Sequence, residues 1–174
     1  GKSVLLKHIV GLLLPDAGEV WFDGRRIDTL GERKLSQIRT RVGFLFQMGA
    51  LFDSLTVAEN IGFPIVEHTH KPPDEVRRIV LQKLRLIGLP DLGTRMSGEL
   101  SGGQRKRVAL ARAIALNPEV ILYDEPTTGL DPVRADVINE LIIKLQRELQ
   151  VTSIVVTHDM NSAFKVADRI VMLH

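Results

Sequence analysis

The sequence contains no cysteine at any of its 174 positions. This absence excludes disulfide bonds, thiolate catalysis and metal sites built from cysteine sulfur, and it fits a reducing compartment. The sequence also lacks any run near the roughly 20 apolar residues that a membrane-spanning helix needs. Its most apolar short stretches, residues 9–14 and 120–123, are therefore predicted to be buried elements of a folded domain.

The sequence also has little net charge. Its 23 Lys and Arg residues nearly balance 21 Asp and Glu residues, which leaves a net charge of +2. A nucleic-acid-binding protein normally carries a basic excess on one face, so we expect no nucleic-acid partner. Hydrophobic residues make up 44% and charged residues 25%, which is typical of a globular chain of one domain, alone or with a small additional lobe.

Helix and strand patterns alternate near both ends of the sequence. Strands are expected at residues 19–22, 25–27, 42–46, 120–123, 153–156 and 170–173, and helices at residues 1–14, 30–38, 57–63, 74–87, 101–116, 131–149 and 160–167. The first two strands are predicted to form a hairpin. The alternation of the other strands with helices predicts an α/β fold with a mainly parallel sheet. Residues 51–100 are expected to be mostly helical.

Three short polar residues are expected to cap helices. Thr56, Ser101 and Asp131 each stand directly before a helical pattern. Such residues are favoured at the N-cap because their side-chain oxygen accepts a hydrogen bond from a free backbone N–H group. Pro132 follows Asp131, and proline is favoured at the first helical position. These signals predict helices that begin directly after residues 56, 101 and 131.

The first three residues, Gly1-Lys2-Ser3, match the end of a phosphate-binding loop of the form G-x-x-x-x-G-K-[ST]. In such a loop the backbone amides and the lysine bind phosphate oxygens, and the serine hydroxyl binds Mg²⁺. A chance tripeptide is the alternative, and average residue usage allows it in roughly one chain in twenty of this length. Because the chain begins with glycine and shows no secretory signal, we expect it to be a fragment.

Two acidic residues follow the apolar strand pattern at residues 120–123. Asp124 and Glu125 stand at the carboxyl end of that strand, and ligands of open α/β sheets bind beyond this edge. An acid there can hold Mg²⁺, and a second acid beside it can polarise an attacking water. Two solvated carboxylates at a strand end are the alternative. The motif that precedes them in the sequence favours the first interpretation.

The pentapeptide Leu100-Ser101-Gly102-Gly103-Gln104 is the most informative stretch. Its glycines let a ligand approach the backbone closely, and the positive end of the helix that Ser101 caps can face a phosphate. An ordinary loop with a helix cap is the alternative. Average residue usage allows this pentapeptide by chance in only about one in several thousand chains of this length.

Taken together, these motifs resemble the ATP-binding-cassette (ABC) family, the ATPase subunits of ABC transporters. Residues 1–3 resemble the end of its phosphate loop, Gln47 its Q-loop glutamine, and residues 100–104 its signature. Residues 120–125 resemble its strand with the Mg-site aspartate and the catalytic glutamate, residues 129–131 its D-loop, and His158 its switch histidine. The six motifs stand in the family's order and extend over the whole chain.

The resemblance implies a P-loop NTPase (ABC ATPase) core with a mainly parallel sheet, plus a helical subdomain. The core would comprise residues 1–50 and 101–174, and the helical subdomain would comprise residues 51–100 and lead to the signature. We expect the family's N-terminal strands and the front of its phosphate loop to lie outside the chain.

The resemblance also implies a head-to-tail homodimer that encloses two ATP molecules. The residues expected to bind ATP are Gly1, Lys2, Ser3, Ser101, Gly102, Gly103, Gln104 and Asp131. Each site would take residues 101–104 from the partner chain and its other groups from one chain. Hydrolysis would then depend on closure of the dimer.

Within each site the resemblance implies distinct roles. Glu125 would polarise the attacking water, and Lys2 and His158 would stabilise the charge of the γ-phosphate. The catalytic set is therefore expected to be Glu125, His158 and Gln47, and the Mg²⁺ ligands Ser3, Gln47 and, through water, Asp124.

One further stretch resembles a particular subfamily. The match is found in residues 46–57, 59–60, 63–64 and 66–69, which resemble the ATPases of phospholipid-trafficking systems that work with Mce-type lipid-binding proteins. This resemblance implies an ATPase that powers lipid transport across the cell envelope from the cytoplasmic side of the inner membrane, bound to an integral-membrane permease. The stretch would lie in the groove that receives the permease's coupling helix.

Two alternatives remain open for the function. One is the ATPase of an importer for amino acids or other small solutes, since the permease and its binding protein decide the substrate. The other is an ABC ATPase of translation or DNA repair. The short spacing between Gln47 and Ser101 leaves no room for the long coiled coil of chromosome and DNA-repair ATPases, and this favours transport.

The remaining charged residues are predicted to be surface groups. A solvated helix face is expected for Arg105, Lys106, Arg107 and Arg112, with contact to phosphate or a partner as the alternative. A solvated surface is expected for Arg25, Arg26, Arg33, Lys34, Arg39 and Arg41. The histidines His8, His68, His70 and His174 show no spacing typical of metal ligands.

Overall fold

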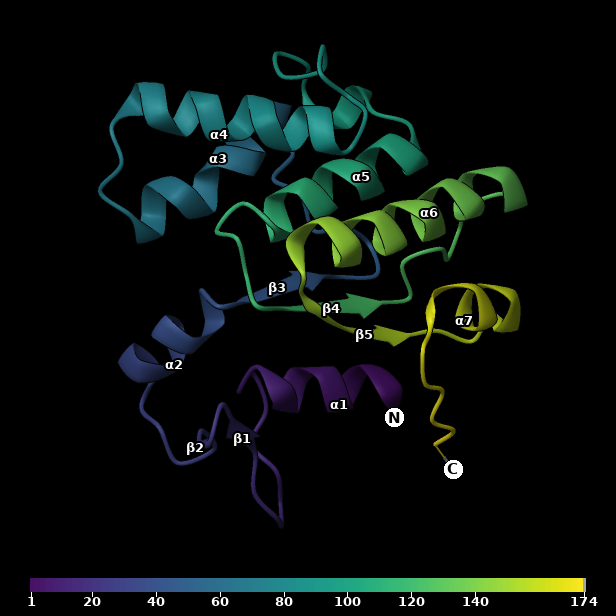
Figure 1. The fold of residues 1–174 in the computed structure, drawn as a ribbon. Helices are drawn as coiled ribbons and strands as arrows, with labels where there is room; N and C mark the ends of the chain where they lie inside the picture. Colours follow the sequence, from purple (N-terminus) through teal and green to yellow (C-terminus); the bar gives the residue numbers. More distant parts are fainter. Residues whose placement is uncertain (174) are drawn as a thin grey trace.

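The structure, a computed structural model, describes residues 1–173 (Figure 1). Its elements in chain order are α1 (Lys2–Ile9), β1 (Trp21–Phe22), β2 (Arg25–Arg26), α2 (Glu32–Arg39), β3 (Val42–Leu45), α3 (Val57–His68), α4 (Pro73–Leu86), a 3₁₀ helix (Ser97–Glu99), α5 (Gly102–Ala113), β4 (Val120–Asp124), α6 (Pro132–Leu149), β5 (Thr152–Val156) and α7 (Met160–Val166). The expected alternation of strands and helices is confirmed.

The central sheet has the strand order β3-β4-β5, and its strands run parallel. Val42 pairs with Val120 where β3 and β4 begin, and Asp124 pairs with Val156 where β4 and β5 end. β4 is buried along most of its length, as expected for a parallel strand with helices on both faces. The short strands β1 and β2 form a separate antiparallel hairpin. The predicted α/β fold with a mainly parallel sheet is therefore confirmed.

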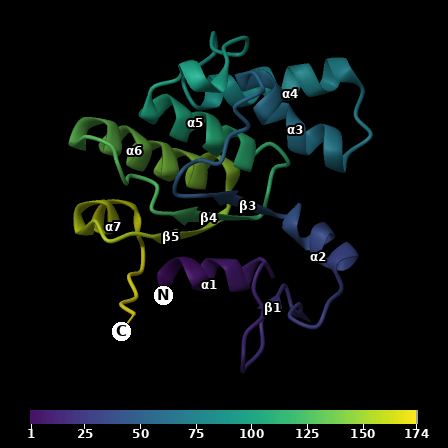
Figure 2. The ribbon, with the colours of Figure 1, turned by 180° about the vertical axis from the view of Figure 1, so that it is seen from behind.

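Helices cover both faces of the sheet (Figures 1 and 2). α5 and α6 lie on one face, with α3 and α4 beyond α5, whereas α1 lies on the opposite face near the hairpin. Leu6 of α1 is fully buried and belongs to one apolar cluster with Val42, Leu122 and Val156 of the strands. The burial of this side chain holds the start of the chain against the sheet.

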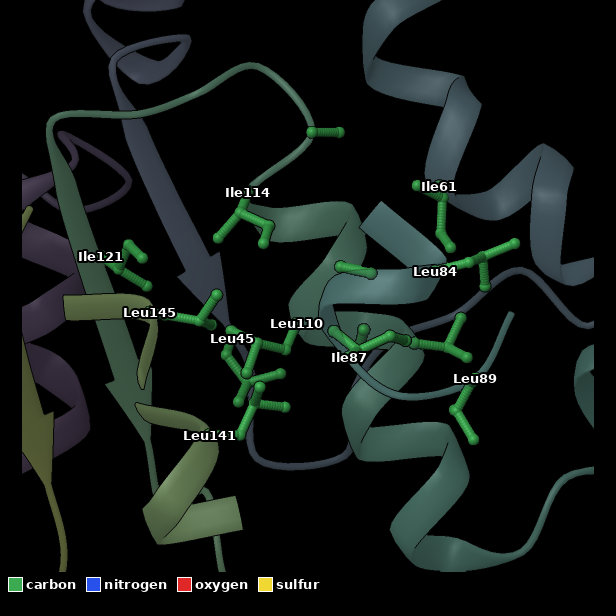
Figure 3. Close-up of a cluster of buried hydrophobic side chains, with 14 of the residues drawn as sticks. Leu45, Ile61, Leu84, Ile87, Leu89, Leu110, Ile114, Ile121, Leu141 and Leu145 are labelled. Carbon is green, nitrogen blue, oxygen red and sulfur yellow. The ribbon is translucent and has the colours of Figure 1, made fainter. Parts of the chain in front are cut away.

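The largest apolar core lies between the sheet and helices α3 to α6 (Figure 3). It includes Ile121 of β4, Leu110 of α5, Leu141 of α6 and Ile61 of α3. Full burial of a side chain such as Leu110 contributes about 1.5–3 kcal/mol. Residues 51–100 are mostly helical, as predicted, and they share this core with the sheet. Their division from the rest of the chain as a subdomain stays a prediction.

The predicted helix caps are present. The Thr56 hydroxyl accepts the backbone N–H of Glu59 at 3.2 Å, and the Glu59 carboxylate accepts the N–H of Thr56 at 2.8 Å. Asp131 accepts the backbone N–H of Arg134 at 3.0 Å. Ser101 caps α5 in the same manner as Thr56 caps α3. Each pair satisfies backbone groups that the helix leaves free at its start.

Helix α1 ends earlier than predicted. It stops at Ile9 because Gly11 takes a left-handed conformation with φ +64. The amides of Gly11 and Leu12 then bond back to the carbonyls of His8 and Lys7 at 3.0 and 2.9 Å, which is a common glycine-based helix ending. Residues 12–14 are exposed in consequence, so the prediction that residues 9–14 form one buried element is wrong.

The strand predicted at residues 170–173 is also wrong. These residues follow α7 without regular structure, and their side chains are 46–76% exposed. Figure 1 shows this end of the chain leading away from the sheet. A β-branched apolar stretch forms a strand only where a neighbouring strand pairs with it. The prediction for His174 lies outside the described residues.

Candidate functional site

Most candidate residues lie where the parallel strands end. Asp124 is the last residue of β4 and Glu125 follows it, while Gln47 and His158 come two residues after β3 and β5. Because the strands are parallel, their carboxyl ends bring distant parts of the chain to one edge of the sheet. We refer to Gln47, Asp124, Glu125 and His158 as the carboxyl edge.

Helix α1 reaches this edge from the other face of the sheet. The hydroxyl of Ser3 donates a hydrogen bond of 2.7 Å to Oδ1 of Asp124, which stands 121 positions further along the chain. Asp124 is only 6% exposed, so the bond holds a carboxylate that has little contact with solvent. Gly1 and Lys2 precede Ser3 at the start of α1 and are exposed. The first motif and the acidic pair therefore lie together.

Glu125 contacts the residue that follows β5. Its Oε2 lies 2.8 Å from Nδ1 of His158, and the hydroxyl of Thr128 donates to the same oxygen at 3.2 Å. The Glu125 side chain is 12% exposed, whereas that of His158 is 69% exposed. A carboxylate held in place between an imidazole and a hydroxyl can orient a water molecule and accept its proton.

The backbone of Glu125 is unusual for its residue type. Its φ of +50 lies in the left-handed region, which side chains other than glycine adopt at a cost of about 1–2 kcal/mol. Its N–H donates to the carbonyl of Val156 at 2.9 Å, and its own carbonyl accepts from Lys106 at 3.3 Å. Backbone strain of this kind gathers at functional sites, where the surrounding contacts maintain it.

Lys106 contradicts the prediction of a solvated helix face. It is only 7% exposed, and its ammonium donates to the backbone carbonyls of Gln47 and Glu125. Burial lowers the pKa of this ammonium, while the carboxylates of Glu125 and Asp124 act in the opposite direction. The prediction failed because these partners lie on other elements, far away in the sequence.

Arg112 and Arg107, on the same helix, are also not simply solvated. The guanidinium of Arg112 donates to the carbonyl of Gly49 at 3.0 Å and lies 5.6 Å from the ring centre of Phe52. Arg107 donates to the carbonyl of Ile87 at 3.4 Å. Helical spacing held a signal for all three cations, because each stands three or four residues from buried residues of α5: Lys106 from 103, 109 and 110, Arg107 from 103, 110 and 111, and Arg112 from 108 and 109.

The signature residues lie apart from the carboxyl edge. Ser101 accepts the N–H of Gln104 at 3.4 Å, and Gln104 Oε1 accepts the N–H of Ser101 at 2.9 Å. Ser101 and Gly102 are exposed, whereas Gly103 is buried. The structure records no hydrogen bond from these residues to Asp124, Glu125 or His158 within residues 1–173. One chain thus brings together the first motif and the acids but leaves the signature separate.

Gln47 and Asp131 are both accessible to a ligand. The Gln47 residue is exposed, and only its backbone carbonyl is engaged, by Lys106. The Asp131 side chain is 48% exposed and lies 3.2 Å from the guanidinium of Arg134. The loop before Asp131 runs beside the signature, because a Cβ added to Gly102 would lie 3.7 Å from Leu130. The roles predicted for Gln47 and Asp131 stay predictions.

The basic residues between positions 25 and 41 lie at the surface, as predicted, although several of their side chains form ion pairs or hydrogen bonds. Arg41 pairs with Glu119 and Asp23, each at 2.7 Å. Arg39 donates to the carbonyls of Val10 and Gly11 and so covers the free end of α1. Arg25, Arg33 and Lys34 are exposed. Among residues 1–173, no three His, Asp or Glu side chains gather closely enough to hold a metal ion.

A groove lies between α2 and β3 on one side and α3 and α5 on the other. Its volume is about 490 Å³, and its lining includes Arg39, Phe44, Phe46, Phe52, Phe63 and Arg112. Two ring pairs, Phe44 with Phe46 and Phe52 with Phe63, form much of its apolar wall. The groove is therefore apolar with basic groups at its margin. Within the described residues, none of the helices is long and apolar enough to cross a membrane.

The chain is similar to several ATP-binding proteins of transport systems. It is 50% identical over 168 residues to the intermembrane phospholipid transport system ATP-binding protein MlaF of Haemophilus influenzae, which covers 97% of this chain and 64% of that protein. It is 46% identical over 173 residues to the probable ribonucleotide transport ATP-binding protein mkl of Mycobacterium leprae, covering 99% and 50%. The chain thus spans half to two thirds of the length of these relatives.

Solved structures of ATP-binding cassettes share the fold. The ATP-binding cassette MJ0796, in a dimeric post-hydrolysis state bound to ADP and Pi, matches with a TM-score of 0.86 and 38% identity, over 95% of this chain and 73% of that chain. CbiO1 of Clostridium perfringens, part of the ABC transporter complex cbiONQ, matches with a TM-score of 0.83 and 36% identity, over 92% and 63%. These matches confirm the predicted ABC ATPase fold.

The sequence pattern of the family covers most of the chain. The family model described as "ABC transporter" matches residues 1–128, a range that contains Ser3, Gln47, the signature and both acids. Together with the parallel sheet and the groups at its carboxyl edge, this match identifies the chain as a member of the ABC transporter ATPase family.

Proposed function

We propose that this chain binds and hydrolyses ATP to power a membrane transporter. The observation that carries the proposal is the joint placement of Ser3 with Asp124 and of Glu125 with His158 at one edge of the sheet. Phosphoryl transfer depends mainly on positioning and charge neutralisation. The two pairs supply a hydroxyl, two carboxylates and an imidazole at one place, which suits that chemistry.

The start of α1 suits the phosphates of ATP. Gly1 and Lys2 are exposed at the N-terminus of a helix, where the partial positive charge and the free N–H groups favour an anion. The Lys2 ammonium adds a full charge there. We assign Gly1, Lys2 and Ser3 to phosphate binding, and Lys2 together with His158 to stabilising charge on the γ-phosphate.

The residues beside Ser3 suit Mg²⁺. The hydroxyl oxygen of Ser3 and Oδ1 of Asp124 lie 2.7 Å apart, and both are oxygen atoms that can coordinate a metal ion. The side-chain amide of the exposed Gln47 offers a third oxygen. Mg²⁺ prefers oxygen ligands and is usually bound by one or two protein groups, waters and substrate phosphates, so it needs no cluster of carboxylates. When bound, the ion would neutralise phosphate charge. Ser3, Gln47 and Asp124 are the residues that would hold it.

Glu125 is the proposed general base. Its carboxylate is mostly buried and fixed by His158 and Thr128, so it can hold an attacking water in one orientation. His158 keeps most of its surface exposed and can face the phosphate while it contacts Glu125. Gln47 is the third member of the catalytic set because it stands two residues after the neighbouring strand β3, at the same edge of the sheet.

A second copy of the chain would complete each site. Ser101 and Gly102 are exposed, and within residues 1–173 they form no hydrogen bond to the carboxyl edge of their own chain. They can therefore serve as donors to a nucleotide held by a partner, together with Gly103, Gln104 and Asp131. Support comes from the dimeric MJ0796 cassette bound to ADP and Pi, which shares 38% identity. We propose a head-to-tail homodimer.

The groove beside β3 is the proposed docking site for an integral-membrane permease. Its aromatic wall offers apolar surface to a short helix, and Arg39 and Arg112 stand at its margin. A chain that docks in this way would lie at the cytoplasmic side of the inner membrane. The proposed cargo is phospholipid, since the 50% identical relative is named for intermembrane phospholipid transport, and an Mce-type lipid-binding protein is the proposed further partner.

The test uses the full-length protein purified with its co-expressed permease. ATP hydrolysis is measured with and without Mg²⁺, and lipids in the purified complex are identified by mass spectrometry. We expect Mg²⁺-dependent hydrolysis that phospholipid vesicles stimulate. Stimulation by amino acids or other small solutes would favour an importer, and an absence of hydrolysis in the complex would contradict the proposal.

A further inference from the structure

Three cations of α5 bind backbone carbonyls outside the helix, and two of them, Lys106 and Arg112, bind the segment that follows β3. Lys106 donates to the carbonyl oxygens of Gln47 and Glu125, and Arg112 donates to that of Gly49 at 3.0 Å. α5 is also the helix that Ser101 caps. The helix that begins at the signature is therefore bonded directly to the carboxyl edge of the sheet.

The segment after β3 also packs closely on α5. Gly49 has φ +78, and a Cβ placed on it would lie only 3.3 Å from the Cβ of Ala109. Its N–H donates to the carbonyl of Phe46 at 2.8 Å, which closes a tight turn over residues 46–49 that contains Gln47. Residues 47–49 are thus held by packing as well as by the two cations.

The burial of Lys106 requires bonds that compensate its charge. A buried ammonium is costly unless hydrogen bonds or opposite charges accompany it. Lys106 is 7% exposed, and burial lowers its pKa against the influence of Glu125 and Asp124. Its bonds go to Gln47 and Glu125. These two residues follow the neighbouring strands β3 and β4, and the proposed chemistry uses both.

The bond to Glu125 acts on a strained part of the backbone. Glu125 has φ +50, and its N–H is fixed by Val156 at 2.9 Å. The carbonyl of the same residue is fixed by Lys106. With both ends of the residue held, the direction of its Cα–Cβ bond is fixed, and the contacts with His158 and Thr128 then fix the carboxylate.

We propose that Lys106 is a positioning residue that couples the signature helix α5 to Gln47 and Glu125. This inference rests on the proposed function, in which Ser101 serves the partner's nucleotide while Gln47 and Glu125 serve the chain's own. Lys106 then connects the two sites of the dimer. A displacement of α5 at one site changes the placement of Gln47 and Glu125 at the other.

The first test substitutes Lys106→Met in the full-length protein. Lys83→Met is the matched control, because Lys83 is 4% exposed and bonds only to Asn117 Oδ1 at 2.6 Å, within the described residues. Loss of hydrogen bonds from a charged donor predicts a kcat about 10- to 100-fold lower in Lys106→Met, with KM for ATP changed by less than about twofold. Lys83→Met should keep both constants near the original values.

The second test is hydrogen exchange of backbone amides without nucleotide. Amides of residues 47–50 and 125–128 should exchange faster in Lys106→Met and remain unchanged in Lys83→Met. Because this measurement needs no hydrolysis, it still tests the positioning role if the proposed ATPase function fails. Unchanged exchange in these segments, or equal kcat in the two variants, would overturn the proposal.

A third variant separates charge from packing. Lys106→Arg keeps a cation at the position and should recover part of the lost turnover relative to Lys106→Met. The comparison is made between variants with matched thermal stability. A turnover of Lys106→Arg no higher than that of Lys106→Met would show that lost packing alone lowers the turnover. If Lys106→Met does not fold, Lys106→Gln takes its place with the same expected and contrary results.

Discussion

The carboxyl edge of the sheet and the exposed N-terminal end of α5 are organised in opposite ways. At the carboxyl edge, Ser3 bonds Asp124 and Glu125 contacts His158, so groups from three parts of the chain hold one another. At the start of α5, the side chains of Ser101 and Gln104 each accept the backbone N–H of the other, and within residues 1–173 they bond to no group of the carboxyl edge. The first region is assembled within one chain, and the second is an exposed helix end that serves a partner's nucleotide in the proposed dimer.

This difference defines what each region can contribute to catalysis. Groups that hold one another before a ligand arrives reduce the cost of ordering at the moment of reaction. The exposed N-terminal end of α5 is capped by its own residues, so its contribution to a nucleotide site depends on the presence of a partner chain. A site composed of both would hydrolyse ATP only after two chains meet.

The largest expected effect comes from Glu125→Gln at the carboxyl edge. The substitution keeps the shape of the side chain but removes the proposed general base, which contributes roughly 10²- to 10⁴-fold to a rate. ATP hydrolysis by the full-length protein should fall by that factor while nucleotide affinity, measured by titration with a fluorescent analogue, is retained. Turnover near the original rate would rule out Glu125 as the base.

A comparable loss is expected from Ser101→Arg at the start of α5. The bulky cation blocks the surface that would meet a partner's nucleotide, so hydrolysis should fall by at least about 100-fold if the oxyanion-type contacts of that helix end are lost. Nucleotide binding by the monomer should be unaffected, because Ser101 lies apart from the carboxyl edge of its own chain. Weakened binding in the monomer would contradict this separation.

A smaller effect distinguishes capping from function. Ser101→Ala and Thr56→Ala each remove one N-cap hydrogen bond from similar capping boxes, and each should lower the free energy of unfolding by about 0.5–2 kcal/mol. Chemical denaturation measures that loss. Hydrolysis should fall only in Ser101→Ala. An equal loss of activity in Thr56→Ala would mean that stability alone explains the effect.

The parts of the fold that depend on local signals could be predicted from the sequence. Thr56, Ser101 and Asp131 mark helix starts because capping involves residues only three positions apart. The alternation of apolar strands with helices likewise predicted the parallel sheet, and the motif spacing predicted which residues lie at strand ends. These signals need no knowledge of distant contacts.

The errors arose where distant contacts decide the outcome. Lys106 can be buried because its ammonium donates hydrogen bonds to the carbonyls of Gln47 and Glu125, which stand 59 and 19 positions away. Residues 170–173 have the composition of a strand, but no strand of the described part of the chain pairs with them. In both cases the local pattern is ordinary and the surroundings override it. The exposure of residues 12–14 has a local cause instead, because Gly11 ends α1 early.

The central claim, that each site combines the carboxyl edge of one chain with the signature of another, is tested most directly by mixing two inactive variants. Full-length protein carrying Glu125→Gln is combined with protein carrying Ser101→Arg, and ATP hydrolysis is measured. A mixed dimer contains one site with an intact Glu125 from one chain and an intact Ser101 from the other. We predict turnover well above that of either variant alone, whereas a mixture no more active than its components would contradict the account.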